Sequence, residues 1–339
     1  MPSSSTTTTT TIKLHGFAKR APDTPSGSFF CQKLETHLRL ASFPRANYTL
    51  VDALPFRQPK GKLPCVTLSR PGAADVFLED SHFILRALAA DGVIPDVDAP
   101  LGLSAAQRAD ARAWQAWTEE LVYAAVVCTR WLRPANYARS AAALPVPAPV
   151  RPFLAWFLHR RISTRLRASG VGMHSDAELD AILEEWVDGL DARLADGRQW
   201  FHGGDTPSSA DVMLGSLLMN CAGEEANPEF NAMWMRRERV RAYAERCTRQ
   251  WFPEYEGVLQ LLRKTTSLFE PSDSFKFMCV PPGVLLKAAA QLKAPRRMTK
   301  PNSLSKHVQA AAGAFAGLRA RSIVLSFHDT ESRLQARDY

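Results

Sequence analysis

The sequence predicts an α/β domain followed by an all-helical domain. Strand and helix patterns alternate over residues 11–94, whereas residues 104–257 show only helical periodicity. A strand–helix–strand unit comes first and a hairpin follows it, so the first domain needs both parallel and antiparallel pairs. We therefore expect a mixed four-stranded sheet and then helices, with a disordered polar leader over residues 1–10 and a basic extension over residues 267–339.

The first domain is accounted for by four strands and two helices. The strands are expected at residues 11–18, 48–51, 65–68 and 75–78, with Pro71-Gly72 as the turn between the last two. The helices are expected to begin at Ser28 and at Asp80-Ser81. The first helix is expected to direct Phe30, Leu34 and Leu38 to the core and to turn Lys33, Glu35 and Arg39 away from it. This order of elements is the thioredoxin-like arrangement.

Capping boxes mark the beginnings of three helices in the second domain. In such a box a serine or threonine and an acid or amide three residues later satisfy free backbone N–H groups. The pairs are Ser104 with Gln107, Ser175 with Glu178, and Ser208 with Asp211. We expect Ser208 and Asp211 to be structural. We also expect the acidic outer face of the helix after Ser175 to be solvated and to pair with the arginines of a basic helix at residues 153–167.

Composition narrows the class of protein. The 339 residues, 46% of them apolar, can bury a sizeable core, and the longest uncharged runs fall well short of the ~20 residues that a membrane-spanning helix needs. The leader lacks the basic and apolar regions of a signal peptide. Six scattered cysteines with no C-x-x-C favour a reduced, cytoplasmic compartment. No metal site is expected, because the cysteines and eight histidines lack metal-ligand spacing.

The basic residues of the C-terminal extension account for the net charge of +8. Nine basic residues and no acidic one lie between Lys276 and Arg321, and 8 minus 9 leaves about −1 for the rest of the chain. The globular body therefore lacks the basic surface of a nucleic-acid-binding domain, and no nucleic-acid partner is expected. We expect the extension to be separable from the fold and to be attracted to an anionic membrane or an acidic protein surface.

Five segments, in this order, resemble one protein family. They are SFFCQKLETHLRLA, KGKLPCV, LEDSHFILRAL, TPSSADVMLGSLLMN and RVRAYAERCTRQWFPEY. Together they resemble the branch of the glutathione S-transferase superfamily that contains the failed axon connections proteins and the metaxins. The resemblance extends over roughly residues 11–256. It implies a thioredoxin-like N-terminal domain that glutathione lies against, an all-helical C-terminal domain, and a homodimer as one possible assembly.

The resemblance also implies where glutathione would bind. Leu63 matches the residue before the family's cis-proline, here Pro64, and its backbone would pair with the cysteinyl unit. Asp80 and Ser81 match the pair that binds the γ-glutamyl ammonium and carboxylate, and the alternative is that they only cap the second helix. Lys62 or another basic residue beside it would receive the glycyl carboxylate. The implied ligand is glutathione, as substrate or as bound ligand, with no metal.

Ser28 and Cys31 are the candidates for chemistry at the sulfur of glutathione. Ser28 matches the serine or cysteine that transferases keep at the beginning of the first helix, where backbone N–H groups favour a thiolate. The alternative is that Ser28 only caps the helix, since the proline that follows this serine in relatives is replaced by Phe29. Cys31 lies one turn later, where thioredoxins keep a resolving thiol, and we expect it to face the core.

Two functions remain open. The first is a glutathione S-transferase-like protein that binds glutathione in its N-terminal domain and conjugates it to electrophiles or acts in thiol chemistry. The alternative is a non-catalytic adaptor of the metaxin or failed axon connections type, favoured by the missing proline, the long loop before Ser28 and the C-terminal extension. Metaxins serve protein import at the mitochondrial outer membrane, so the resemblance implies a peripheral location there as the alternative to the cytoplasm.

Overall fold

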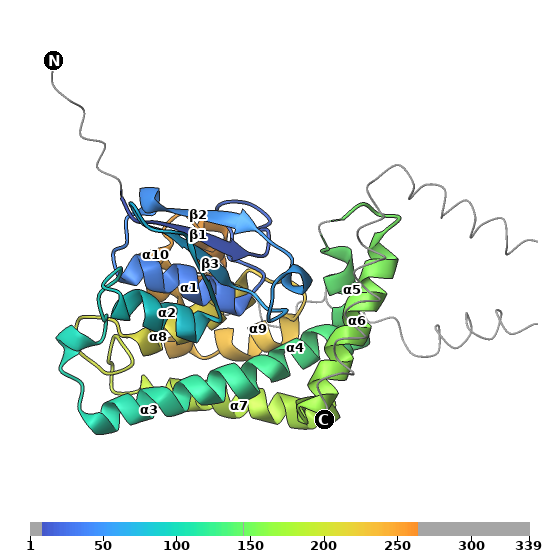
Figure 1. The fold of residues 1–339 in the computed structure, drawn as a ribbon. Helices are drawn as coiled ribbons and strands as arrows, with labels where there is room; N and C mark the ends of the chain where they lie inside the picture. Colours follow the sequence, from blue (N-terminus) through green and yellow to red (C-terminus); the bar gives the residue numbers. More distant parts are fainter. Residues whose placement is uncertain (1–8, 145, 264–339) are drawn as a thin grey trace, which may run out of the picture. The chain divides into compact units, whose positions relative to one another are not determined.

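Among the residues that the structure describes, strands occur only before residue 80, and the elements after residue 80 are helices, as Figure 1 shows. The computed structural model describes residues 9–144 and 146–263. All but the last two residues of the predicted leader, and the whole predicted extension at 267–339, lie outside the described residues. No helix in the described ranges is long and apolar enough to cross a bilayer.

The four strands form one mixed sheet in the order β2-β1-β3-β4. β1 (Thr11–Gly16) pairs in parallel with β2 (Tyr48–Asp52) and antiparallel with β3 (Cys65–Ser69). β3 pairs antiparallel with β4 (Val76–Glu79). The predicted mixed sheet is confirmed, because it contains both parallel and antiparallel pairs. Each strand also lies within two residues of its expected bounds.

Two helices share an apolar core with the sheet. α1 (Phe29–Leu40) contributes Leu34 and Leu38, and α2 (Ser81–Ala90) contributes Ile84 and Leu88. These side chains pack with buried residues of the strands, among them Ile12, Leu14, Val66 and Leu68. The apolar side chains recur every three or four residues on the helices and every second residue on the strands, so each element has one apolar face. Packing these faces together gives the first domain its two layers, a sheet and a pair of helices.

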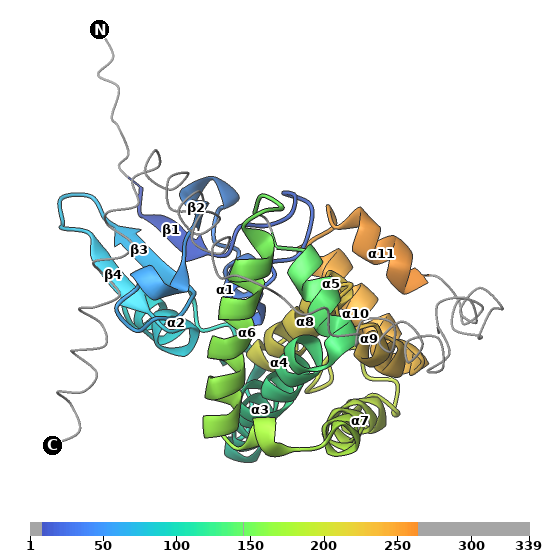
Figure 2. The same ribbon diagram turned by 90° about the vertical axis from the view of Figure 1, so that its right-hand side faces the viewer.

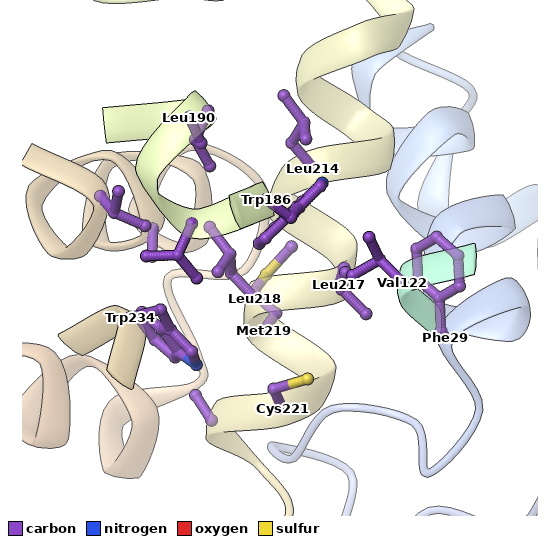
Figure 3. Packing of buried hydrophobic residues seen from close by; sticks show 14 of the residues in the cluster. Phe29, Val122, Trp186, Leu190, Leu214, Leu217, Leu218, Met219, Cys221 and Trp234 are labelled. Atoms are coloured by element: carbon purple, nitrogen blue, oxygen red, sulfur yellow. The ribbon is translucent and has the colours of Figure 1, made fainter. Parts of the chain in front are cut away.

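The helical part surrounds one central helix, α8 (Ser209–Ala222), in which every residue after the first is buried. Figure 3 shows Leu214, Leu217 and Leu218 of this helix among side chains from its neighbours. The other helices are α3 (Ala105–Ala116), α4 (Tyr123–Leu132), α5 (Pro134–Ala142), α6 (Arg151–Ala168), α7 (Asp176–Arg193), α9 (Pro228–Met235), α10 (Glu238–Trp251) and α11 (Glu256–Arg263), and a π-helical turn at Trp117–Val122 joins α3 to α4. The thioredoxin-like domain followed by a helical domain is thus confirmed.

The three capping boxes form at the beginnings of α3, α7 and α8. In the last box the Asp211 carboxylate is fully buried and accepts hydrogen bonds from the Ser208 backbone N–H, the Ser208 hydroxyl, the Phe201 N–H and the Tyr243 hydroxyl, each at 2.7 Å. Burial raises the pKa of Asp211, and these hydrogen bonds oppose that shift. Asp211 therefore ties together the beginning of α8, the loop before it and α10.

The expectation that Lys33 and Glu35 face away from the core was wrong. Both side chains are buried, with residue exposures of 3% and 2%. The reason is that α8 packs against the side of α1 that the sheet leaves open, where the Ser216 hydroxyl donates to Thr36 Oγ1 at 2.9 Å. Each buried charge has a partner, since Lys33 Nζ lies 2.7 Å from Glu119 Oε1 and Glu35 pairs with two cations.

The acidic face of α7 does not pair with the arginines of α6, so that expectation was also wrong. Its carboxylates pair instead with arginines at the beginnings of α5 and α10. Arg133 pairs with Asp176 and Asp180, Arg237 with Glu184 and Asp188, and Arg239 with Asp191. The arginines of α6 are left without these partners.

Candidate functional site

The hairpin brings Leu63-Pro64 alongside Asp80-Ser81. Cys65 pairs with Glu79 at the end of the β3–β4 ladder. Leu63 and Pro64 directly precede Cys65, and Asp80 and Ser81 directly follow Glu79, so the two pairs flank the same end of the ladder. The Leu63-Pro64 peptide is cis. The four residues therefore meet at one edge of the domain, beside the beginning of α2.

Asp80 has the most unusual backbone at this edge. It is the N-cap of α2, and its Oδ1 accepts from the His82 N–H at 3.0 Å. Its φ of 73° is positive, which within the described ranges only Ser42 shares among non-glycine residues. Such a conformation costs on the order of 1–3 kcal/mol and recurs at binding sites, and aspartate tolerates it better than most residues. Ser81, which follows, is buried.

Ser28 is the N-cap of α1. Its Oγ accepts from the Cys31 N–H at 3.4 Å, and its own N–H donates to Ser26 Oγ at 3.2 Å. The residue is only 5% exposed. The hydroxyl is thus engaged by the helix that it begins and has little contact with solvent.

Two free thiols lie in the core behind Ser28. Cys31 is 3% exposed and packs with Leu63 and Cys65. Burial raises the pKa of Cys31, and hydrogen bonds from Ser28 and from the backbone of Phe17 only partly oppose this. Burial, together with the Glu79 carboxylate, raises the pKa of Cys65 to about 12. Both groups are therefore thiols at neutral pH, and neither is an activated nucleophile.

Aromatic side chains join the beginning of α1 to the helical part. The Tyr123 ring, from α4, lies 5.1 Å from the ring of Phe29 and 5.2 Å from that of Phe30, measured between centroids. Phe29 is fully buried. Stacked and edge-to-face rings at this spacing attract one another. The first turn of α1 is therefore fixed by packing.

Basic side chains lie beside the Leu63-Pro64 edge. Lys60 and Lys62 are exposed, and neither ammonium is in an ion pair with a described carboxylate. The Lys60 Nζ lies 5.7 Å from the centre of the Phe83 ring, at the beginning of α2. Arg161 of α6 reaches the same loop, because its Nη2 lies 3.9 Å from the place that a Cβ on Gly61 would occupy. These groups could receive an anion.

Two cavities stand out in the described part of the chain, and neither contains Ser28, Leu63, Pro64, Asp80 or Ser81. One, of about 340 Å³, lies between β1, β2 and the loop before α1, and includes Lys19, Cys31 and Glu35. The other, of about 390 Å³, lies between the end of α1 and α10. No cluster of three possible metal ligands occurs in the described ranges.

The structure contains an ion network between α1 and the helical part that the sequence did not predict. Glu35 Oε2 lies 2.8 Å from Lys19 Nζ, and Glu35 Oε1 lies 3.1 Å from Arg39 Nη2. Lys19 also donates to the Tyr255 hydroxyl at 2.8 Å, and Arg39 pairs with Glu254 at 2.6 Å. Only the Glu35–Arg39 spacing of four residues is a local signal. The other partners are brought together by the fold.

Parts of this chain are similar to known proteins. The family profile of the glutathione S-transferase N-terminal domain matches residues 29–136. Metaxin-1 from Macaca fascicularis is 32% identical over 173 residues, which are 48% of this chain and 51% of that protein. Failed axon connections from Drosophila melanogaster is 26% identical over 283 residues, which are 78% of this chain and 64% of that protein. The chain is a metaxin-like protein of the glutathione S-transferase superfamily.

The metaxin-like chain spans about half the length of Metaxin-1 and less than two thirds of Failed axon connections. Among solved structures, glutathione transferase F7 from Populus trichocarpa is similar, with 15% identity and a TM-score of 0.43 over 75% of this chain and all of that one. The profile match begins at Phe29, directly after Ser28, and includes Leu63, Pro64, Asp80 and Ser81.

Proposed function

We propose that this metaxin-like protein is a non-catalytic interaction protein, an adaptor of the metaxin or Failed axon connections type. One observation carries the proposal: the groups that a transferase would offer to the glutathione sulfur are buried in the fold. Ser28 is only 5% exposed, and the Cys31 thiol is buried with a raised pKa. A group that donates to a thiolate, or attacks an electrophile, must reach the ligand in an active form.

Apolar side chains on the surface of the first domain support a protein partner. Phe56, Phe77 and Phe83 are large apolar residues that remain exposed. Phe77 lies on β4, an edge strand whose free side can pair with another chain. A second copy of this chain is one such partner, and light scattering during gel filtration tests for a homodimer.

Glutathione binding without conjugation is the second candidate function. It is favoured by the positive φ of Asp80, next to Ser81 and at the same end of the β3–β4 hairpin as Leu63-Pro64. In this proposal Asp80 and Ser81 hold the γ-glutamyl end, the Leu63 backbone pairs with the cysteinyl unit, and Lys62 or Lys60 meets the glycyl carboxylate. Glutathione would then be a bound ligand of an adaptor.

Calorimetric titration of glutathione and a conjugation assay with a general electrophile separate these roles. We expect no conjugation above the uncatalysed rate. If glutathione binds, Asp80→Ala should weaken binding by about 1.5–3 kcal/mol, the value of a hydrogen bond to a charged group, and Ser28→Ala should leave it nearly unchanged. Asp188→Ala, on the surface of α7, is the control. Conjugation that is lost in Ser28→Ala would refute the non-catalytic proposal and support a transferase.

The cellular location of the protein is also part of the proposal. The similarity to metaxins supports a peripheral location at the mitochondrial outer membrane as the alternative to the cytoplasm. Cell fractionation followed by alkaline extraction tests this, because a peripheral protein is released from the membrane pellet.

We also propose that residues 11–94 and 104–257 are the two domains and that the extension at 267–339 can be removed. Limited proteolysis should then leave a stable core that ends between residues 256 and 272.

A further inference from the structure

α6 carries positive charge that no other described element balances. Five arginines and no acidic residue occur between residues 151 and 168. None of the five forms an ion pair with a carboxylate in the described ranges, since the nearby acids of α7 pair with Arg133, Arg237 and Arg239. Uncompensated arginines on one helix favour an anionic partner.

The same helix exposes aromatic side chains. Phe153 is 69% exposed and Trp156 is 54% exposed, although their ring centroids are only 6.1 Å apart. Val150, directly before the helix, is exposed as well. Residues 140–150 carry no charge, so the apolar character continues beyond the beginning of the helix. Figure 2 shows α6 on the side of the helical part that faces the viewer, in front of α4.

The apolar and the basic side chains follow one another along the axis of α6. At about 1.5 Å per residue, Arg160 lies about 6 Å beyond Trp156, and Arg167 about 16 Å beyond it. The polar headgroup layer of one leaflet is about 5–8 Å thick. A helix that enters this layer with Phe153 and Trp156 would therefore hold Arg160 and Arg161 at the level of the lipid phosphates.

We propose that α6 docks this protein on a bilayer surface that contains anionic lipids. Phe153 and Trp156 enter the headgroup layer, and the arginines from Arg160 onward bind the lipid phosphates. Tryptophan and phenylalanine are side chains that settle at this interface, and the planar guanidinium binds phosphate with two parallel hydrogen bonds. The exposed rings of Phe153 and Trp156 beside the arginines favour a lipid interface over an acidic protein surface. The proposal does not depend on whether glutathione binds.

The first domain adds to the same basic surface. Arg161 reaches the loop that carries Lys60 and Lys62, because its Nη2 approaches Gly61 between them. Both lysines are exposed and lack a described carboxylate partner. Lys60 and Lys62 therefore extend the positive field of α6 and should increase its attraction to anionic lipid.

Flotation of the full chain with vesicles tests the proposal. The vesicles are phosphatidylcholine alone, or phosphatidylcholine with about one third phosphatidylserine, a fraction that gives a negative surface potential. The wild type should bind the anionic vesicles more strongly. Each arginine near the surface contributes about fivefold, so Arg160→Glu/Arg161→Glu should weaken binding by about 25-fold or more. Phe153→Ser/Trp156→Ser should also weaken it.

Two controls isolate α6 from general charge and from the basic extension, which every variant keeps. Arg108→Glu/Arg112→Glu changes the net charge equally on exposed α3, and Phe77→Ser removes an exposed aromatic side chain from β4. Both should bind nearly as the wild type does. Circular dichroism establishes that each variant is folded. Equal binding of the α6 variants and the controls would overturn the proposal.

A second measurement reports insertion directly. Brominated lipids quench tryptophan fluorescence only at close range, so the wild type should lose emission on anionic vesicles, and Trp156→Phe should abolish most of that loss. Binding that depends on Arg160 and Arg161 but shows no quenching through Trp156 would contradict insertion and indicate an acidic protein surface as the partner of α6. Absence of vesicle binding by the wild type would overturn the proposal.

Discussion

Glu35 is a carboxylate buried where α1 meets the helical part, and replacing it with alanine should destabilise the protein strongly. The change leaves Lys19 and Arg39 without the carboxylate that lies 2.8 Å and 3.1 Å from them. Removing one member of a buried ion pair costs about 3–5 kcal/mol, because the remaining charge stays desolvated. Lys19 keeps the Tyr255 hydroxyl and Arg39 keeps Glu254, so we expect the lower end, about 3 kcal/mol.

Urea unfolding of the wild type and Glu35→Ala measures this loss of unfolding free energy. Glu245→Ala is the matched control, because Glu245 also pairs with two arginines, Arg249 and Arg263, but at the surface. The control should lose no more than about 1 kcal/mol. Replacing both charges, as in Lys19→Met/Glu35→Leu, should recover part of the loss. A Glu35→Ala loss equal to that of the control would refute the reasoning.

Buried groups elsewhere give three more tests. Burial lowers the pKa of His37 from 6.5 to about 4, so as the pH falls through this range the unfolded chain takes up the proton first. The free energy of unfolding should therefore decrease by about 3 kcal/mol as the pH falls from 6.5 to about 4. His37→Gln should remove that decrease in urea titrations at each pH. A variant that loses as much stability as the wild type over this pH range would contradict the prediction. Asp211→Ala should cost at least about 3 kcal/mol in the same assay, because its four hydrogen-bond donors lose their partner. Cys31 and Cys65 should react with a thiol reagent at neutral pH only after unfolding, and peptide mapping that finds rapid labelling of either in the native protein would show that they are accessible.

Elements whose signals are local were predicted well from the sequence. The hairpin followed from Pro71-Gly72 between two short strand patterns, and the capping boxes located the beginnings of α3, α7 and α8. The alignment of Leu63-Pro64 with Asp80-Ser81 is a consequence of that hairpin. These features depend on residues within about twenty positions of one another, so spacing alone reveals them.

Features that depend on distant contacts were not predictable. Lys33 and Glu35 look like the outer face of an amphipathic helix, and only the packing of α8 against α1 makes them buried. The partners of the α7 carboxylates were also assigned to the wrong helix. Whether Ser28 caps α1 or faces a ligand could not be decided from its spacing, because both roles place a serine at the beginning of a helix.

The pKa of the glutathione thiol in the presence of saturating protein tests the central claim most directly. Thiolate absorbance reports this pKa while the pH is varied, for the wild type and for Ser28→Ala. Because Ser28 is buried at the beginning of α1, the thiol should titrate near its ordinary value of about 8.5 with both proteins. A pKa lowered by one unit or more with the wild type, and restored in Ser28→Ala, would contradict the non-catalytic function and identify Ser28 as a thiolate donor.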